Sequence, residues 1–326
     1  MASTWNVNRV VTEKRPCGIG ALHFICLMAG ARVIRVFSRG HSWFLMSRVT
    51  VVLREIFRRS NKAVFQVFGC RSIEISLADD YWVPSIMLGH ENEREILAVL
   101  PQVLDEGSLF IDVGANVGWW SLYASTIIPD PARIVAIEPA ASTYHDLTRN
   151  CELNQNPFTC RRAAVWNKGG ESLSLRFSER SREGAHVQWD GGPRGRYFDQ
   201  TEQVSSVCLD EIVEDSPRPA SSLVLKLDVE GVEVQALRGL QRKLSEVDVI
   251  IYEDHGNDPG AGATSAIMRL GFEVYFGSRF GHMRLVRSIG DVQTIKRNAR
   301  IGYNFFAVRP SSQIASVIRQ MAASSM

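Results

Sequence analysis

The chain has 326 residues, of which 45% are hydrophobic, 22% charged and 9% aromatic, as in an ordinary globular protein. With 37 Lys and Arg against 35 Asp and Glu, the formal net charge is only +2, so the overall charge gives no reason to expect a nucleic-acid-binding protein. The 6 cysteines form no C-x-x-C pair and have no His-rich spacing beside them, which argues against a zinc site and a disulfide framework.

Residues 1–60 form a basic extension before the predicted core. Residues 1–70 hold 11 Lys and Arg but only 2 Asp and Glu. An apolar stretch at 18–31 follows two basic residues, as in a signal peptide, but it is shorter than the ~20 residues that span a bilayer. Residues 49–59 have the pattern of a basic amphipathic helix. Three interpretations stay open: a helical or disordered extension, peripheral membrane contact through residues 1–60, or translation from a later start such as Met46.

Residues 61–100 are expected to lead into the core. Alternating apolar and polar residues predict a hairpin over 62–77 with a turn near Gly69. A helix should begin near residue 90, where acidic residues occupy the first turn, and run to Leu100.

Residues 101–310 alternate between strand and helix patterns, and residues 311–326 are expected to be a C-terminal tail. Helices are predicted from 119 onward and at 142–153, 233–243 and 262–270. Seven strands are predicted, at 109–113, 133–138, 161–165, 222–227, 247–252, 272–276 and 303–308. Such alternation is typical of a parallel, doubly wound α/β sheet with right-handed crossovers. Residues 178–200 break the rhythm and form either a substrate-side loop or hairpin or a mobile surface loop.

The most informative motif runs from Leu109 to Gly118. An apolar strand ends near Asp112, and Gly114, Asn116 and Gly118 follow at the end of the sheet where open α/β folds bind ligands. A dinucleotide fingerprint would need a glycine where Asn116 stands. An acid just before the glycine loop is unfavourable for a pyrophosphate, but it suits the sulfonium and α-ammonium groups of S-adenosylmethionine (SAM).

A second acid, Glu138, ends the next predicted strand, 26 residues after Asp112. This offset is near the ~20 residues at which an acid binds ribose hydroxyls in such folds. A carboxylate accepts hydrogen bonds from both hydroxyls of a ribose, so the residue type fits this task.

Together these motifs resemble the FkbM family of SAM-dependent methyltransferases. The resemblance covers about residues 91–308. It rests on five segments: Asp112–Gly118, Ile137–Pro139, Leu147–Asn154, Leu225–Gly239 and Tyr252–His255.

The resemblance implies a Rossmann-like class I methyltransferase fold, a mostly parallel seven-stranded doubly wound sheet with an antiparallel last strand, preceded by the N-terminal helical or hairpin extension. It implies SAM as cofactor and O-methylation of a hydroxyl on a sugar, glycolipid or polyketide-type metabolite. The residues expected to bind the cofactor are Asp112, Gly114, Asn116, Gly118, Glu138, Ala164 and Asp228, with Ala164 beside the turn where adenine would lie.

A hydroxyl nucleophile needs a general base, because its pKa is far above 7. Three candidates stay open: His255, Asp228 and Glu230. Lys226 lies on the same strand face as Asp228, and the two residues would equally suit a structural ion pair. Asp228 and Glu230 could, with Glu253, also hold a divalent metal, but their spacing does not demand one and we predict none.

Other functions remain as alternatives. They are N- or carboxyl-methylation of a small molecule or peptide, and SAM binding without catalysis. A nucleic-acid methyltransferase is disfavoured, because the chain has no N/D-P-P-[YFW] tetrad for a flipped base. We expect a small-molecule or glycan-type acceptor, no nucleic acid, and a cytoplasmic protein with or without membrane association; the oligomeric state stays open.

Overall fold

The computed structural model describes residues 22, 25–31, 42–57, 62–88, 93–178, 181–187, 200–258, 260–278, 282–298 and 302–324. The chain divides into two compact units. The first comprises residues 1–92 with 152–155, and the second comprises residues 93–151 with 156–326. Much of the predicted basic extension, including residues 1–21 and 32–41, lies outside the described residues.

The first unit contains the predicted hairpin. Its elements are α2 (Ser42–Phe57), β1 (Lys62–Val67), β2 (Arg71–Ser76) and α3 (Trp82–Leu88). The two strands pair antiparallel, and the turn between them places Phe68 and Gly69 at positive φ. Asn154, from the short piece of chain that joins this unit, accepts from Ser72 N at 2.8 Å and donates to Ser72 O at 2.6 Å. Its amide thus takes the place of a strand neighbour at the edge of β2.

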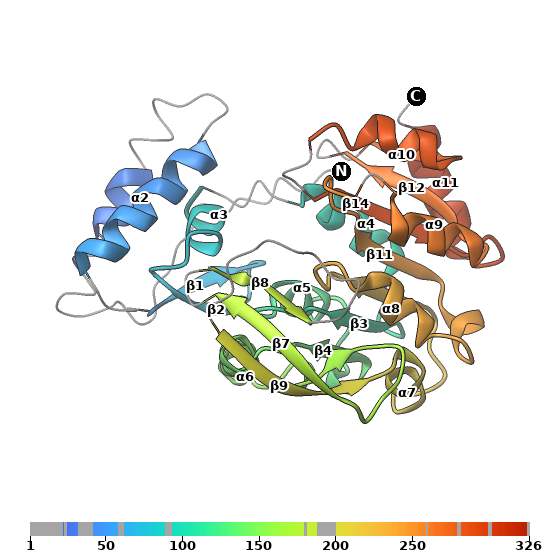
Figure 1. Ribbon diagram of the computed structural model, residues 1–326, viewed down its shortest axis with the longest axis horizontal. Coiled ribbons are helices and arrows are strands. Elements are labelled where there is room, and N and C mark those ends of the chain that lie inside the picture. The colour runs from blue at the N-terminus through green and yellow to red at the C-terminus, as the bar shows by residue number, and fades with distance from the viewer. Residues whose placement is uncertain are drawn as a thin grey trace. The chain divides into compact units, whose positions relative to one another are not determined.

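The second unit is built on an eight-stranded sheet with the order β13-β12-β14-β11-β10-β3-β4-β5 (Figure 1). The strands are β3 (Leu109–Val113), β4 (Ile134–Ile137), β5 (Thr159–Arg161), β10 (Leu223–Leu227), β11 (Val249–Glu253), β12 (Glu273–Gly277), β13 (Met283–Val286) and β14 (Asn304–Val308). The five strands from β5 to β11 are parallel, and β14 lies antiparallel between β11 and β12. This confirms the predicted mostly parallel doubly wound sheet with an antiparallel last strand.

The sheet has one strand more than the seven predicted, because residues 283–286 fold back on β12 as an antiparallel edge strand. The predicted strand at 161–165 is also divided. Thr159–Arg161 pairs with β4 in the central sheet, whereas β6 (Ala164–Val165) pairs with β9 in a second sheet. The short segment Arg161–Val165, two arginines followed by three apolar residues, carries no local signal for this change of partner.

The second sheet has the order β6-β9-β7-β8 and contains β7 (Ser172–Ser178), β8 (Ser181–Val187) and β9 (Gln200–Val207). Strands β7 and β8 form an antiparallel hairpin, so this part of the 178–200 insert is paired. Residues 188–199, with Trp189, Tyr197 and Phe198, lie outside the described residues.

The helices of the second unit connect these strands. They are α4 (Arg94–Val103), α5 (Trp119–Ala124), α6 (Ala141–Leu153), α7 (Leu209–Glu214), α8 (Glu233–Arg238), α9 (Gly262–Arg269), α10 (Ile289–Ile295) and α11 (Ile314–Ala323). Helix α8 ends five residues before the predicted 243, and α11 occupies most of the segment expected to be a tail. In the described part of the chain, no helix is both long and apolar enough to cross a membrane.

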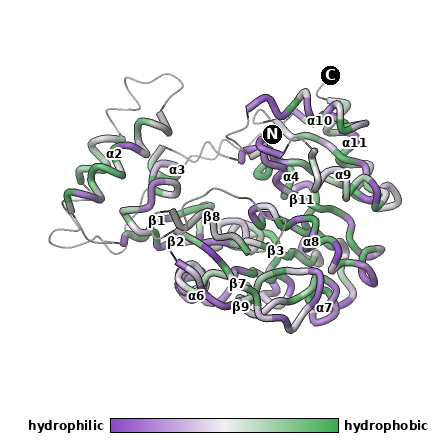
Figure 2. Tube along the Cα trace, in the orientation of Figure 1, coloured by the Kyte–Doolittle hydropathy of each residue, from purple (hydrophilic) through white to green (hydrophobic). Residues whose placement is uncertain are grey.

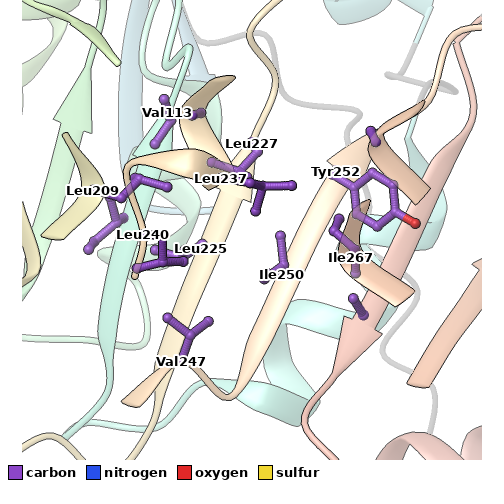
Figure 3. Packing of buried hydrophobic residues seen from close by; sticks show 14 of the residues in the cluster. Val113, Leu209, Leu225, Leu227, Leu237, Leu240, Val247, Ile250, Tyr252 and Ile267 are labelled. Atoms are coloured by element: carbon purple, nitrogen blue, oxygen red, sulfur yellow. The ribbon is translucent and has the colours of Figure 1, made fainter. Parts of the chain in front are cut away.

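The core of the second unit lies on the two central strands and the helices beside them. All five residues of β3 and of β10 are buried, and the tube along β11 is green in Figure 2. In Figure 3, Leu225 and Leu227 of β10 and Ile250 of β11 lie among hydrophobic side chains of α7, α8 and α9. Each such side chain contributes about 1.5–3 kcal/mol by leaving water, which holds the strand ends rigidly in place.

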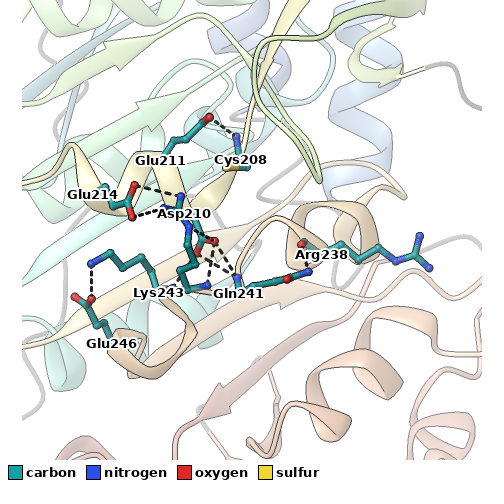
Figure 4. Close-up of polar contacts among 9 residues, drawn as sticks. Cys208, Asp210, Glu211, Glu214, Arg238, Gln241, Lys243 and Glu246 are labelled. Carbon is teal, nitrogen blue, oxygen red and sulfur yellow. Dashed lines mark hydrogen bonds and ion pairs between the residues drawn. The ribbon is translucent and has the colours of Figure 1, made fainter.

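A cluster of polar contacts fixes the segment that follows α8 (Figure 4). The buried carboxylate of Asp210 accepts the backbone N–H groups of Gln241, Arg242 and Lys243 at 2.9–3.2 Å. Burial raises the pKa of Asp210, but these bonds outweigh it and the pKa is lowered. Asp210 is therefore a structural acid.

Candidate functional site

The acids predicted from the sequence end three adjacent strands. The loops that carry them are bonded to one another: Gly114 N and Ala115 N both donate to Ile137 O at 2.9 Å, and Asp228 N donates to Val113 O at 3.0 Å. The carboxyl ends of β3, β4 and β10 therefore form one rigid edge that presents Asp112, Glu138 and Asp228.

Asp112 is fully buried on β3. Its Oδ2 accepts from Ser121 Oγ at 2.7 Å, whereas its buried Oδ1 has no hydrogen-bond partner among the described residues. Burial raises the pKa of Asp112 despite the attraction of Lys226 and the bond from Ser121. A buried acceptor without a partner is rare, and a ligand donor is one explanation for it.

Glu138 is held by the glycine loop itself. Its Oε2 accepts from Asn116 N at 3.1 Å and its Oε1 from Ala140 N at 3.0 Å. Asn116 adopts a φ of 51°, in the left-handed region that Asn tolerates, within the turn that aims its N–H at Glu138. Burial raises the pKa of Glu138 to about 7 in spite of these two bonds. The two sequence signals therefore belong to one structural unit.

The glycines of the loop are required by the protein's own packing. Gly114 has a φ of 78°, and a Cβ there would lie 1.8 Å from the backbone oxygen of Asp228. Gly118 has a φ of 90°, and a Cβ there would lie 2.9 Å from Leu147 Cδ1. At both positions it is a neighbouring chain segment that comes close to the glycine backbone. Binding of a cofactor by the two glycines stays a prediction.

Asp228 forms an ion pair with Lys226. Nζ of Lys226 lies 2.8 Å from Oδ2 of Asp228, with side chains 4% and 32% exposed respectively. Burial alone would lower the pKa of Lys226, but the carboxylates of Asp228, Asp112 and Glu93 outweigh it and raise the pKa. A buried ammonium thus lies between the ends of β3 and β10.

The other two candidate bases lie in the loops that follow β10 and β11. His255 Nδ1 accepts from Asn257 N at 3.2 Å, and His255 O accepts from Asp258 N at 3.0 Å, so both bonds keep the residue in its own loop. These two hydrogen bonds therefore do not connect His255 to Asp112, Glu138 or Asp228. Glu230 has a φ of 52°, and after burial and Asp228 its charge is a further cause that raises the pKa of Glu253.

Ala164 is buried in a small hydrophobic cluster of the second sheet. Ala140, two residues after Glu138, and Val232, four residues after Asp228, belong to the same cluster. The cluster therefore adjoins the acidic edge, and the predicted contact of Ala164 with adenine stays a prediction.

The sequence analysis missed a polar group contributed by α4 and β14. Glu93 Oε2 accepts from Trp120 Nε1 at 3.1 Å, and Asn304 Nδ2 donates to Glu95 Oε1 at 2.9 Å. Burial raises the pKa of Glu93 to about 7 and that of Glu253, the strand neighbour of Asn304, to about 9. In the sequence the acids at 91–95 indicate only a helix start, because Trp120 and Asn304 lie 27 and 209 residues from their partners Glu93 and Glu95 and meet them only in the fold.

No three His, Cys, Asp or Glu side chains in the described part of the chain come together as metal ligands would.

The strand order, with one antiparallel strand between β11 and β12, and the acids at the carboxyl ends of β3, β4 and β10 define a Rossmann-like methyltransferase fold. The sequence model of the Methyltransferase FkbM domain matches residues 112–290, more than half of the chain. The chain therefore belongs to the FkbM methyltransferase family, as the resemblance of its motifs predicted.

Two curated relatives share part of this region. The chain is 28% identical over 169 residues to the hexuronic acid methyltransferase AglP of Haloferax volcanii, which covers 51% of this chain and 64% of the relative. It is 27% identical over 156 residues to methyltransferase 1 of Beauveria bassiana, which covers 41% of this chain and 59% of the relative. The matched region thus spans less than two thirds of either relative.

Solved structures were compared as well. The FkbM methyltransferase of Methylobacillus flagellatus aligns with a TM-score of 0.39 and 10% identity, over 88% of this chain and 59% of that one. The precorrin-6y C5,15-methyltransferase of Geobacter metallireducens aligns with a TM-score of 0.36 and 13% identity, over 66% of this chain and 86% of that one.

Proposed function

We propose that the protein is a SAM-dependent methyltransferase that methylates a hydroxyl oxygen on a sugar or a sugar-bearing lipid. The observation that carries this proposal is the buried, partnerless Oδ1 of Asp112 at the edge of the sheet, beside the loop-held carboxylate of Glu138.

The residues present fit SAM. The Oδ1 atom of Asp112 can accept a hydrogen bond from the α-ammonium group, and the carboxylate of Glu138 has lone pairs left for the two ribose hydroxyls. Gly114, Asn116 and Gly118 would shape the loop around the cofactor, and Ala164 would lie by the adenine. When bound, SAM supplies an activated methyl group on a positively charged sulfur, and a largely acidic surround favours such a cation.

For the acid–base step we favour Asp228 over His255 and Glu230. The Nδ1 atom of His255 already accepts a backbone hydrogen bond, so a neutral ring carries its proton on Nε2 and offers no free acceptor. Asp228 is partly exposed at the end of β10 and keeps lone pairs beside the one used by Lys226. In the proposed reaction the carboxylate of Asp228 would take up the proton of the acceptor hydroxyl, and SAM, when bound, would supply the methyl group that this oxygen receives and leave as S-adenosylhomocysteine.

The acceptor is proposed from the family. One relative is named a hexuronic acid methyltransferase, which favours a sugar hydroxyl here. A polyketide-type hydroxyl, N- or carboxyl-methylation of a small molecule or peptide, and SAM binding without catalysis are the alternatives. They are separated by incubating the protein with labelled SAM and panels of uronic acids, neutral sugars, amines and carboxylic acids.

Calorimetric titration with S-adenosylhomocysteine (SAH) tests the cofactor site. We expect micromolar binding that Asp112→Asn and Glu138→Gln each weaken at least about tenfold, since each removes an ionic acceptor. Asp210→Asn is the matched control, because it changes a buried structural acid outside the site and should leave the affinity unchanged. A folded wild-type protein that binds neither SAH nor SAM would overturn the proposal.

For the first unit we propose peripheral contact with an anionic membrane from the cytoplasmic side. On α2, Leu45, Val52 and Ile56 are 41%, 57% and 64% exposed and stand seven and four residues apart, so they share one helix face. The opposite side of α2 holds the fully buried Thr50. Together with the excess of basic residues in this part of the sequence, the exposed apolar stripe supports a lipid surface as the partner.

A further inference from the structure

The pairing of β10 with β3 places two oppositely charged residues side by side. Lys226 and Asp112 are partners in the parallel register, and they are 3% and 0% exposed. Paired residues on neighbouring strands point to the same face of a sheet, and Asp228, two residues after Lys226, shares that face. One buried cation therefore faces two carboxylates that the proposed function assigns to different tasks.

Within the described residues, the hydrogen bonds of Lys226 and Asp112 leave some of their donors and acceptors unused. The ammonium of Lys226 has three donors, one of which reaches Asp228 Oδ2 at 2.8 Å. Asp112 receives a bond from Ser121 on Oδ2, and in the described part of the chain no group donates to its Oδ1. A carboxylate this deeply buried takes up a proton unless a nearby positive charge stabilises its ionised form.

We propose that Lys226 is a positioning residue for the cofactor: its buried ammonium keeps Asp112 ionised, so that Oδ1 can receive the α-ammonium group of SAM, and it holds Asp228 at the end of β10. This inference rests on the proposed function. It also goes beyond it, because it gives a role to a residue that need not touch either substrate.

The electrostatic surroundings agree with this role. Burial raises the pKa of Asp112, and Lys226 is the strongest influence that lowers it. Several further acidic groups of the described residues surround the pair: Glu93 and Glu95 of the α4 start, Glu138 after β4, Asp228, Glu230 and Glu233 after β10, and Glu253 of β11. Removing Lys226 leaves Asp112 buried among like charges, so its pKa must rise further.

The test is calorimetric titration of SAH and SAM between pH 6 and 9, in two buffers of different ionisation enthalpy, which counts the protons released on binding. Lys226→Met should weaken binding at pH 7 at least about tenfold, release about one more proton per cofactor than the wild type, and recover affinity about tenfold per pH unit toward alkaline pH. Lys226→Arg keeps the charge and should restore the wild-type proton count. Lys243→Met, which breaks an ion pair with Glu246 outside the site, should match the wild type.

A second measurement needs no cofactor. If Asp112 is protonated in folded Lys226→Met, its pKa is higher in the folded than in the unfolded state. The stability that comes from binding this proton is then lost as the pH rises. The free energy of unfolding of Lys226→Met should therefore fall more steeply from pH 5 to 8 than that of the wild type. Adding Asp112→Asn to Lys226→Met removes the buried acid and should abolish the extra slope, and it offers a variant that folds if the single one does not.

The outcomes separate the two proposals. A wild-type protein that binds no SAH refutes the proposed function, whereas the unfolding slopes still judge the role of Lys226. Weaker binding by Lys226→Met with an unchanged proton count and an unchanged slope would mean that Lys226 only braces the strand end, and would overturn the inference.

Discussion

The backbone oxygen of Asp228 lies 1.8 Å from the point where a side chain on residue 114 would place its Cβ. Gly114 and Asp228 come from different strands, and Asp228 N donates to Val113 O at 3.0 Å beside this contact. The loop predicted to bind the cofactor and the loop predicted to hold the base are thus fixed against each other. A change at Gly114 must therefore disturb both.

We expect Gly114→Ala to destabilise the protein by more than about 3 kcal/mol, because a positive φ and a backbone clash act together. Gly170→Ala is the matched control, since Gly170 has a φ of 79° and no atom within 4 Å of the added Cβ. It should cost only about 1 kcal/mol from the backbone conformation. Urea unfolding of the two variants measures the difference, and equal losses would show that the contact with Asp228 does not matter.

Glu138 should make stability depend on pH. Burial raises its pKa from 4.5 to about 7 in the folded protein. Its contribution to the free energy of unfolding is therefore fully present below pH 4.5 and is lost as the pH rises through about 7. The free energy of unfolding of the wild type should fall by up to about 3 kcal/mol more than that of Glu138→Gln between pH 5 and 8. Urea titrations of both proteins at the two pH values give this double difference. Parallel pH dependences would mean that Glu138 is ionised throughout.

The base assignment predicts unequal effects of two substitutions. Once an acceptor is found, Asp228→Asn should lower kcat, measured at saturating SAM, by about 10²–10⁴-fold, the usual contribution of a general base. His255→Gln should lower kcat less than about tenfold, because the ring nitrogen that could accept a proton already bonds to Asn257 N–H. Single-turnover rates with labelled SAM separate the two, and the reverse order would make His255 the base.

A buried ion pair holds the loop that carries His255. Lys296 donates to the side chain of Asp254, which is 2% exposed, and to the backbone oxygen of Asp258, so its two bonds flank His255 on both sides. Lys296→Met leaves Asp254 buried without its cation and should cost about 3–5 kcal/mol. Adding Asp254→Asn should recover much of this loss in thermal or urea unfolding. A single variant as stable as the wild type would contradict the role given to the pair.

The sequence predicted four of the five parallel strands, β3, β4, β10 and β11, near their observed bounds, because an apolar run that ends in an acid is a local signal. The fifth, β5, lies at Thr159–Arg161 and not at the predicted 161–165. The sequence placed Asp112, Glu138 and Asp228 on neighbouring strand ends, which the pairing of β4, β3 and β10 confirms. It could not predict the contacts of Glu93 and Glu95 with Asn304 and Trp120, since those depend on how distant segments meet. Edge strand β13 and the second sheet were not predicted for the same reason, because whether a short segment forms a strand depends on the neighbouring strand with which it pairs.

The apolar stripe of α2 gives the last prediction. The full-length protein should sediment with vesicles that contain phosphatidylserine. Most of it should stay in solution with vesicles of phosphatidylcholine alone or at high salt, because basic residues add about 1 kcal/mol each to binding near an anionic surface. Replacing Leu45, Val52 and Ile56 together by Ser removes the exposed apolar face and should abolish sedimentation. The fold should survive, since all three side chains are more than 40% exposed.

The matched control is Glu106→Gln, an exposed change on the second unit that leaves the stripe intact. Equal sedimentation of the wild type and the triple variant would mean that the stripe does not meet lipid, and an altered mass of the wild type in solution would point to a second protein chain as its partner.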